Sequence, residues 1–229
     1  IYFVLEKKNA TSSTNLFRKP ADVLIFGCCM GIMEQKSATS CKNLFQGGLT
    51  MEIRRDFYLN KLIKRKSNGL IKVITGIRRC GKSYLLNTLF YHHLLENGVD
   101  TDHIIRFAFD SADDLYLIGE SLIQIEKEKR GVDPEKFMAY IRSKVTDDGI
   151  YYLLLDEIQM LDCFEAVLNG YLRKDNMDVF VTGSNAKLLS KDVATEFAGR
   201  GDEVHMYPLS FAEFMSVYQG DKYMGLSEY

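Results

Sequence analysis

The sequence predicts an α/β fold: a three-layer sandwich with a mainly parallel, five-stranded sheet and helices on both faces. Short apolar runs alternate with stretches of helical character, and the runs expected as strands are 70–75, 103–109, 150–156, 179–183 and 203–207. Helices are expected at 52–66, 83–96, within 114–146, at 163–173, 186–197 and 210–218, and the polar stretch 111–133 is expected to be a variable insertion. A glycine-rich loop directly follows the first run, and Asp156 and Glu157 follow the third. Ligands of open parallel sheets bind at the carboxyl ends of the strands, so both features indicate one site.

The glycine-rich loop fits the pattern G-x-x-x-x-G-K-[ST], which is the phosphate-binding loop of P-loop NTPases. Its glycines let backbone N–H groups point inward, and the helix that follows presents its positive end to the phosphates. Lys82 is expected to reach the β- and γ-phosphates, and Ser83 to ligate Mg²⁺. The alternative is an ordinary glycine turn before a helix. The expected binding residues for ATP are Gly76, Ile77, Arg78, Arg79, Cys80, Gly81, Lys82, Ser83 and Tyr84.

The two carboxylates follow Tyr151–Leu155, an unbroken apolar run typical of a strand that is buried on both faces. Asp156 is expected to hold the Mg²⁺ shell, as the acid after a hydrophobic strand does in P-loop NTPases. Glu157 is expected to act as the general base that polarises the attacking water. A solvated Asp-Glu pair in a loop is the alternative.

A further apolar run ends in Thr182-Gly183-Ser184-Asn185. If this strand lies between the other two, Ser184 or Asn185 would face the γ-phosphate, and Asn185 is preferred because its amide both donates and accepts. Polar turn chemistry before a helix is the alternative. Arg200 then stands between two glycines after an expected helix at 186–197, where its guanidinium suits phosphate oxygens or pairs with Glu203.

These motifs together resemble one group of AAA-type ATPases, a family of bacteria and archaea in which a poorly understood C-terminal region follows the ATPase core. The matching parts are Gly76–Ser83, Leu153–Gln159, Val179–Leu189 and Phe197–Phe214. The resemblance covers about Glu52 to Tyr218 and implies that Arg200 is an arginine finger. The sequence reaches Tyr229 before any helical lid, so the second sensor arginine of such ATPases has no counterpart here.

Composition agrees with a water-soluble enzyme, with 46% hydrophobic residues and a net charge of −2. This charge is unlike that of an autonomous nucleic-acid binder, and no apolar run is long enough to span a membrane. The five cysteines fit no zinc pattern, and one of them, Cys80, lies in the phosphate loop. A reducing cytoplasm is therefore the expected location.

Residues 1–50 differ from the rest, because they are rich in Ser, Thr and Asn and contain one strong apolar run, Val23–Phe26. Gln46-Gly47-Gly48 can be encoded by a ribosome-binding sequence placed suitably before Met51. We therefore expect 1–50 to be a poorly ordered, upstream-translated extension, with a genuine N-terminal extension as the alternative. The ATPase core is expected at 51–218, and 219–229 would begin a truncated C-terminal region.

The sequence thus predicts an ATP-binding core that hydrolyses ATP to ADP and phosphate. It would drive or gate a C-terminal effector region, which would contact an unknown protein or nucleic-acid partner, and could form a homo-oligomer through Arg200. One alternative is a switch in which ATP binding, and not turnover, drives assembly. A small-molecule P-loop kinase is another, although no Arg-rich lid is visible.

Overall fold

The computed structural model describes residues 2–5, 49–183, 197, 199–218 and 220–228. The chain divides into two units, Tyr2–Glu52 and Ile53–Tyr229. In the first unit, β1 (Tyr2–Leu5) pairs antiparallel with β2 (Leu49–Glu52), two strands that the sequence does not predict. The origin of residues 1–50 as an upstream extension stays a prediction.

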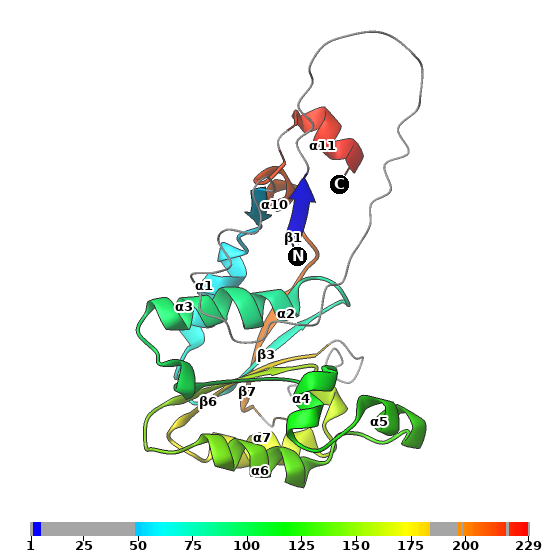
Figure 1. Ribbon diagram of the computed structural model, residues 1–229. Coiled ribbons are helices and arrows are strands. Elements are labelled where there is room, and N and C mark those ends of the chain that lie inside the picture. Colours follow the sequence, from blue (N-terminus) through cyan, green and yellow to red (C-terminus); the bar gives the residue numbers. More distant parts are fainter. Residues whose placement is uncertain (1, 6–48, 184–196, 198, 219, 229) are drawn as a thin grey trace. The chain divides into compact units, whose positions relative to one another are not determined.

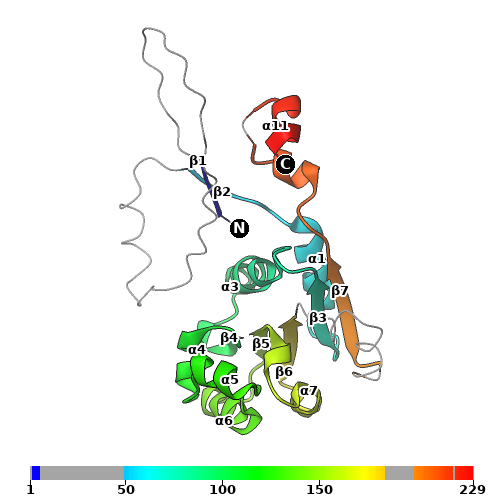
Figure 2. The ribbon, with the colours of Figure 1, turned by 90° about the vertical axis from the view of Figure 1, so that its right-hand side faces the viewer.

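The second unit is built on a five-stranded, wholly parallel sheet in the order β4-β5-β6-β3-β7 (Figures 1 and 2). Its strands are β3 (Ile71–Gly76), β4 (Ile104–Ala108), β5 (Tyr151–Asp156), β6 (Met177–Thr182) and β7 (Gly201–Met206). Each expected strand is found within two residues of its predicted ends. Because β6 lies between β3 and β5, the ends of the three strands that carry the motifs are neighbours.

Helices cover both faces of this sheet, as predicted (Figures 1 and 2). One face carries α1 (Asp56–Arg65), α2 (Lys82–Tyr84), the π-helical segment η2 (Leu85–Phe90) and α3 (Tyr91–Glu96). The other carries α4 (Ala112–Leu117), α5 (Leu122–Glu128), α6 (Pro134–Lys144) and α7 (Phe164–Leu172). The remaining elements are η3 (Thr101–His103), η4 (Ile158–Met160), α10 (Phe211–Met215) and α11 (Lys222–Glu228).

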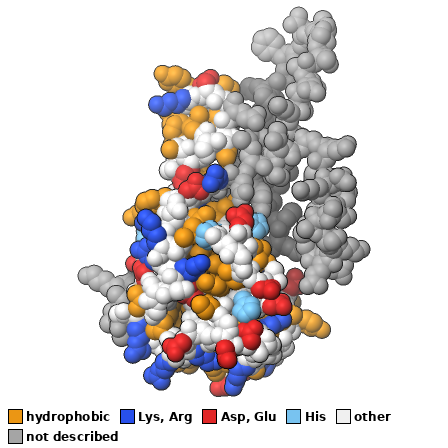
Figure 3. Space-filling model, turned by 90° about the vertical axis from the view of Figure 1, so that its left-hand side faces the viewer, with side chains coloured by type: hydrophobic (Ala, Val, Ile, Leu, Met, Phe, Trp, Pro, Cys, Tyr) orange, Lys and Arg blue, Asp and Glu red, His pale blue; other side chains and the backbone are white. Residues whose placement is uncertain are grey.

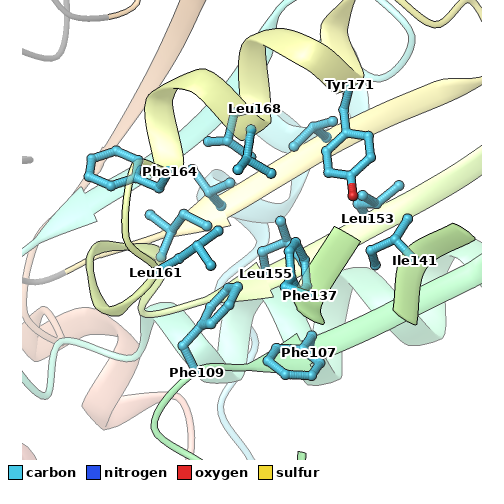
Figure 4. Close-up of a cluster of buried hydrophobic side chains, with 14 of the residues drawn as sticks. Phe107, Phe109, Phe137, Ile141, Leu153, Leu155, Leu161, Phe164, Leu168 and Tyr171 are labelled. Atoms are coloured by element: carbon cyan, nitrogen blue, oxygen red, sulfur yellow. The ribbon is translucent and has the colours of Figure 1, made fainter. Parts of the chain in front are cut away.

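The two faces bury separate hydrophobic clusters, because successive side chains of a strand point to opposite sides. Leu153 and Leu155 pack with Phe107, Phe137 and other residues under α4–α7, as Figure 4 shows. Leu154 lies on the opposite face, among the side chains of α1 and η2. Every residue of β5 is buried, as the unbroken apolar run predicts.

Several helix boundaries in the structure differ from the predicted ones. The helix expected from residue 52 begins at Asp56, because Glu52 belongs to β2 and the Arg55 backbone is not helical. The helix expected over 210–218 ends at Met215, and α11 was not predicted. The helix expected at 186–197 lies outside the described residues, apart from Phe197, which is buried.

The polar stretch 111–133, expected as an insertion, is part of the folded core. Leu115 of α4 and Ile125 of α5 are buried in the cluster on that face. The end of the stretch is also held, because the Val132 N–H donates to the Met160 carbonyl at 2.7 Å and the Asp162 N–H donates to the Val132 carbonyl at 3.0 Å. The segment after β4 is thus tied to the loop after β5.

Candidate nucleotide-binding site

The loop between β3 and α2 needs glycine at both ends. Gly76 has a φ of 145°, and a Cβ there would lie closer than 3.0 Å to the Met206 carbonyl oxygen and 2.9 Å from Cys80 Sγ. Gly81 is the N-cap of α2, with a left-handed φ of 94°. The first glycine therefore lets the loop start against the end of β7, and the second turns the chain into the helix.

Lys82 is buried beneath the loop that precedes it. Its ammonium donates to the carbonyl oxygens of Gly76 and Ile77, both at 3.1 Å. These bonds satisfy a cation that is only 4% exposed. To bind the phosphate of a nucleotide, Lys82 would have to exchange these carbonyl oxygens for phosphate oxygens.

At the end of β5, Asp156 accepts hydrogen bonds from hydroxyl and amide donors. Thr182 Oγ1 donates to Asp156 Oδ1, Asn87 Nδ2 donates to Oδ2 at 3.2 Å, and Ser83 is a further side-chain hydrogen-bond partner. The structure thus joins the end of the glycine-rich loop to the acid of β5 across the end of β6.

Burial raises the pKa of the Asp156 carboxyl above its usual value. The hydrogen bonds from Thr182 and Ser83 oppose this rise, and the negative charges of Asp110 and Glu157 add to it. An ionised carboxylate held in such a place gains from a nearby cation.

Glu157 follows Asp156 in a left-handed conformation, with a φ of 54°. Its N–H donates to Thr182 Oγ1 at 3.1 Å, and Gln159 Nε2 donates to its Oε2. The backbone and the carboxylate of Glu157 are therefore both held at the carboxyl edge of the sheet.

A third acid at this edge, Asp110, stands two residues after β4. Burial raises its pKa, and the negative charge of Glu157 adds to the rise. Asp114 is also partly buried and accepts a hydrogen bond from the Ala108 N–H at 2.7 Å. Throughout the described ranges, no three His, Cys, Asp or Glu side chains form a group that could hold a metal ion by themselves.

Residues 68–215 match the family profile of the AAA domain. The chain belongs to this family. The match includes all five strands of the sheet and the whole glycine-rich loop, so it confirms the predicted family and supports nucleotide binding by this chain.

Two relatives, one from a bacterium and one from an archaeon, match most of this chain. A protein of uncharacterised function from Haemophilus influenzae is 35% identical over 165 residues, which are 71% of this chain and 37% of the relative. Another from Methanocaldococcus jannaschii is 30% identical over 167 residues, 71% of this chain and 31% of that protein. This chain thus matches about a third of the length of each relative.

Solved structures similar to this AAA domain are distant from it. DnaA from Aquifex aeolicus bound to AMPPCP has a TM-score of 0.45 and 16% identity, covering 74% of this chain and 52% of DnaA. A DNA replication initiation factor has a TM-score of 0.43 and 16% identity, covering 69% and 46%. Drosophila ORC bound to DNA has a TM-score of 0.41 and 13% identity, covering 66% and 88%.

The remaining predicted site residues of the AAA domain differ in their exposure and contacts. Ile77, Arg78 and Arg79 are exposed at the tip of the loop, whereas Cys80 is buried. Asn185 lies outside the described residues. Arg200 is exposed and donates from Nη1 to Asn169 Oδ1 of α7 at 3.1 Å.

Three contributors to the site were missed from the sequence. Thr182 is the last residue of β6, and its position before Gly183 was a usable signal. Asn87 lies one helical turn after Ser83, a spacing that places both on one side of a helix. Asp110 gave no signal, because a lone acid after a strand is common.

Proposed function

We propose that this AAA domain binds Mg-ATP and hydrolyses it to ADP and phosphate. The observation that carries the proposal is the junction at the carboxyl edge, where Ser83 and Thr182 both hydrogen-bond to Asp156 and Thr182 also accepts from the Glu157 N–H. The phosphate loop and the two acids are thereby parts of one site.

The residues present fit a magnesium ion. The Ser83 hydroxyl and the Asp156 carboxylate are hard oxygen donors, and Mg²⁺ in such sites is held by one or two protein ligands together with phosphate oxygens and water. The ion would neutralise charge on the phosphate oxygens. The raised pKa of Asp156 supports this fit, because burial without a cation disfavours its charged form.

Lys82 and Glu157 would bind the phosphates and activate the attacking water, respectively. Lys82 would leave the carbonyl oxygens of Gly76 and Ile77 and donate to the β- and γ-phosphates. Glu157 would accept a proton from the water that attacks the γ-phosphorus in line, while the bond from that phosphorus to the β–γ bridging oxygen breaks. Asn185 would contact the γ-phosphate, and Arg200 would complete the site of a neighbouring copy.

The setting of this activity is also part of the proposal. The domain would drive or gate a C-terminal effector region, through which a protein or nucleic-acid partner would bind. A reducing cytoplasm suits the free thiols of Cys80 and Cys163. Within the described part of the chain, none of the helices has the length and apolarity needed to cross a membrane.

The test is calorimetric titration of Mg-ATP into the parent protein, Lys82→Ala and Lys64→Ala. Lys64 is a matched control because it is an exposed lysine of α1. Losing two charge-assisted hydrogen bonds at about 1.5–3 kcal/mol each should weaken binding at least about 100-fold in Lys82→Ala. Equal affinity of all three proteins would refute the assignment of the phosphate loop.

The switch alternative predicts a different pattern. A switch would bind Mg-ATP with the same dependence on Lys82, yet turn over slowly and assemble when ATP is added. Measuring phosphate release and the sedimentation of the same samples separates the two. ATP-induced assembly without phosphate release would replace the hydrolase proposal by the switch.

A further inference from the structure

Arg55 is a buried cation that connects three separate parts of the AAA domain. It is 3% exposed at the N-cap of α1. Its Nη1 donates to the Cys80 carbonyl oxygen of the phosphate loop at 2.9 Å, and its Nη2 donates to the Tyr207 carbonyl oxygen after β7 at 2.8 Å. Its Nε lies 2.8 Å from Glu213 Oε1 of α10.

Tyr58 strengthens the same junction from α1. The Arg55 guanidinium lies 4.7 Å from the centre of the Tyr58 ring, and the Tyr58 hydroxyl accepts from the Tyr207 N–H at 3.1 Å. The segment that leaves β7 is therefore held through both its N–H and its carbonyl. A planar guanidinium can serve several fixed acceptors at once, which a lysine ammonium on a flexible stem cannot do in the same geometry.

Glu213 links this junction to the start of α10. Its Oε2 accepts from both the N–H and the hydroxyl of Ser210 at 2.8 Å, and its own N–H donates to Ser210 Oγ at 3.3 Å. This reciprocal pair is a capping box, which fixes where the helix begins. One carboxylate thus neutralises Arg55 with one oxygen and caps α10 with the other.

The contact between the junction and the phosphate loop, at the Cys80 carbonyl, lies next to residues that would bind the nucleotide. Cys80 precedes Gly81 and Lys82, and the Lys82 ammonium now rests on carbonyl oxygens of the same loop. When Lys82 exchanges these for phosphate oxygens, the carbonyl oxygens of Gly76 and Ile77 lose their donor, and the loop would rearrange. A shift of the Cys80 carbonyl would change its bond to a guanidinium that also donates to the Tyr207 carbonyl oxygen and forms an ion pair with Glu213.

We propose that Arg55 is a positioning residue that transmits nucleotide occupancy of the phosphate loop to α10. The signal enters through the Cys80 carbonyl and leaves through Glu213 and the capping box. This inference rests on the proposed function, since the loop must bind a nucleotide. It assigns to the segment 207–216 the task of reporting that binding to whatever follows the core.

The test is amide hydrogen exchange of peptides covering 207–218, with and without a saturating Mg-bound, non-hydrolysable ATP analogue. The variants are Glu213→Gln and Arg55→Met, with Glu135→Gln and Arg54→Met as matched controls. Glu135 and Arg54 are exposed residues with only loose ion pairs, at 4.0 Å and 3.4 Å. Calorimetry on the same samples gives the affinity for the analogue, and thermal melts give the stability.

In the parent protein and both controls, the analogue should change exchange in 207–218 by about fivefold or more, the lower end of coupling between sites. Glu213→Gln should bind the analogue within about threefold of the parent affinity yet lose this response, because the coupling element is cut outside the binding site. Arg55→Met should lose the response as well. If Arg55→Met does not melt cooperatively, Glu213→Gln alone decides.

A merely structural Arg55 would lower the melting temperature and leave the exchange response intact. The inference is therefore overturned if the parent protein binds the analogue without a change in 207–218, or if Glu213→Gln responds like the parent. Failure of the parent protein to bind the analogue at all would instead refute the proposed function, and the inference with it. Calorimetry distinguishes these two failures.

Discussion

Replacing Gly76 by alanine should disrupt the start of the phosphate loop. The new Cβ would lie closer than 3.0 Å to the Met206 carbonyl oxygen, a backbone atom of β7 that cannot turn away. It would also lie 2.9 Å from Cys80 Sγ. The loop start and the end of β7 would both have to shift.

The size of the effect follows from two costs. A φ of 145° is strained for any residue with a Cβ, at about 1–3 kcal/mol, and over-packing against fixed neighbours costs about 1–3 kcal/mol more. Gly76→Ala should therefore lower the free energy of unfolding by about 2–6 kcal/mol. Gly98→Ala is the control, because its Cβ would meet nothing within 4 Å and only its φ of 81° is strained, at about 1–2 kcal/mol.

Urea unfolding followed by circular dichroism measures both variants, and calorimetry measures their affinity for Mg-ATP. We expect Gly76→Ala to unfold at a lower urea concentration than Gly98→Ala and to bind Mg-ATP more weakly, because the loop is displaced. Equal unfolding midpoints of the two variants, together with unchanged ATP affinity in Gly76→Ala, would show that the loop does not depend on the close approach to β7.

Three further predictions concern the acids and Arg200. Burial raises the pKa of Asp156 in the folded state, so its ionised form costs stability as the pH rises through that pKa. Asp156→Asn should therefore raise the melting temperature of the nucleotide-free protein at pH 7, and this gain should shrink towards pH 4. The stabilisation of the variant by added Mg-ATP should be smaller than that of the parent protein. An unchanged or lower melting temperature at pH 7 would contradict this. Glu157→Gln should keep ATP binding and slow phosphate release about 10²–10⁴-fold, and turnover at the parent rate would exclude Glu157 as the base. Arg200→Ala should bind ATP normally and lose most of the rate enhancement of a finger, about 10³–10⁵-fold, with partial recovery on mixing with Lys82→Ala; a mixture that stays inactive would leave Arg200 with its hydrogen bond to Asn169.

The sequence was sufficient for the parts of the fold that local chemistry determines. The unbroken apolar run of β5 and the glycines of the phosphate loop each restrict the backbone where they stand, so β5 and the start of α2 were found within one residue. The end of α1 was located within a residue, but its start was not, because the non-helical backbone of Arg55 depends on contacts with Cys80, Tyr207 and Glu213. Those partners lie far away in the sequence.

The site residues also divide into those that local sequence predicts and those that depend on contacts with distant residues. The roles expected for Lys82, Ser83, Asp156 and Glu157 follow from a motif that is contiguous or nearly so, and the structure brings these residues to one edge of the sheet; their catalytic roles stay predictions. Asp110 could not be found, since its importance comes from burial and from the charge of Glu157 across a neighbouring strand. The interspersed basic and acidic side chains on the face in Figure 3 agree with the near-neutral composition.

The place of β3 between β6 and β7 has a consequence for folding during synthesis on the ribosome. Among the described residues, the strand partners of 71–76 are 180–182 of β6 and 201–206 of β7, both made long after the phosphate loop itself. Closing such long loops is slow and costs chain entropy before any contact repays it. A nascent chain that ends before residue 206 therefore carries the complete glycine-rich motif without the strand that supports its first turn. Nucleotide added during synthesis would favour only chains whose last strand has been inserted, so that ligand capture reports the completion of the whole sheet.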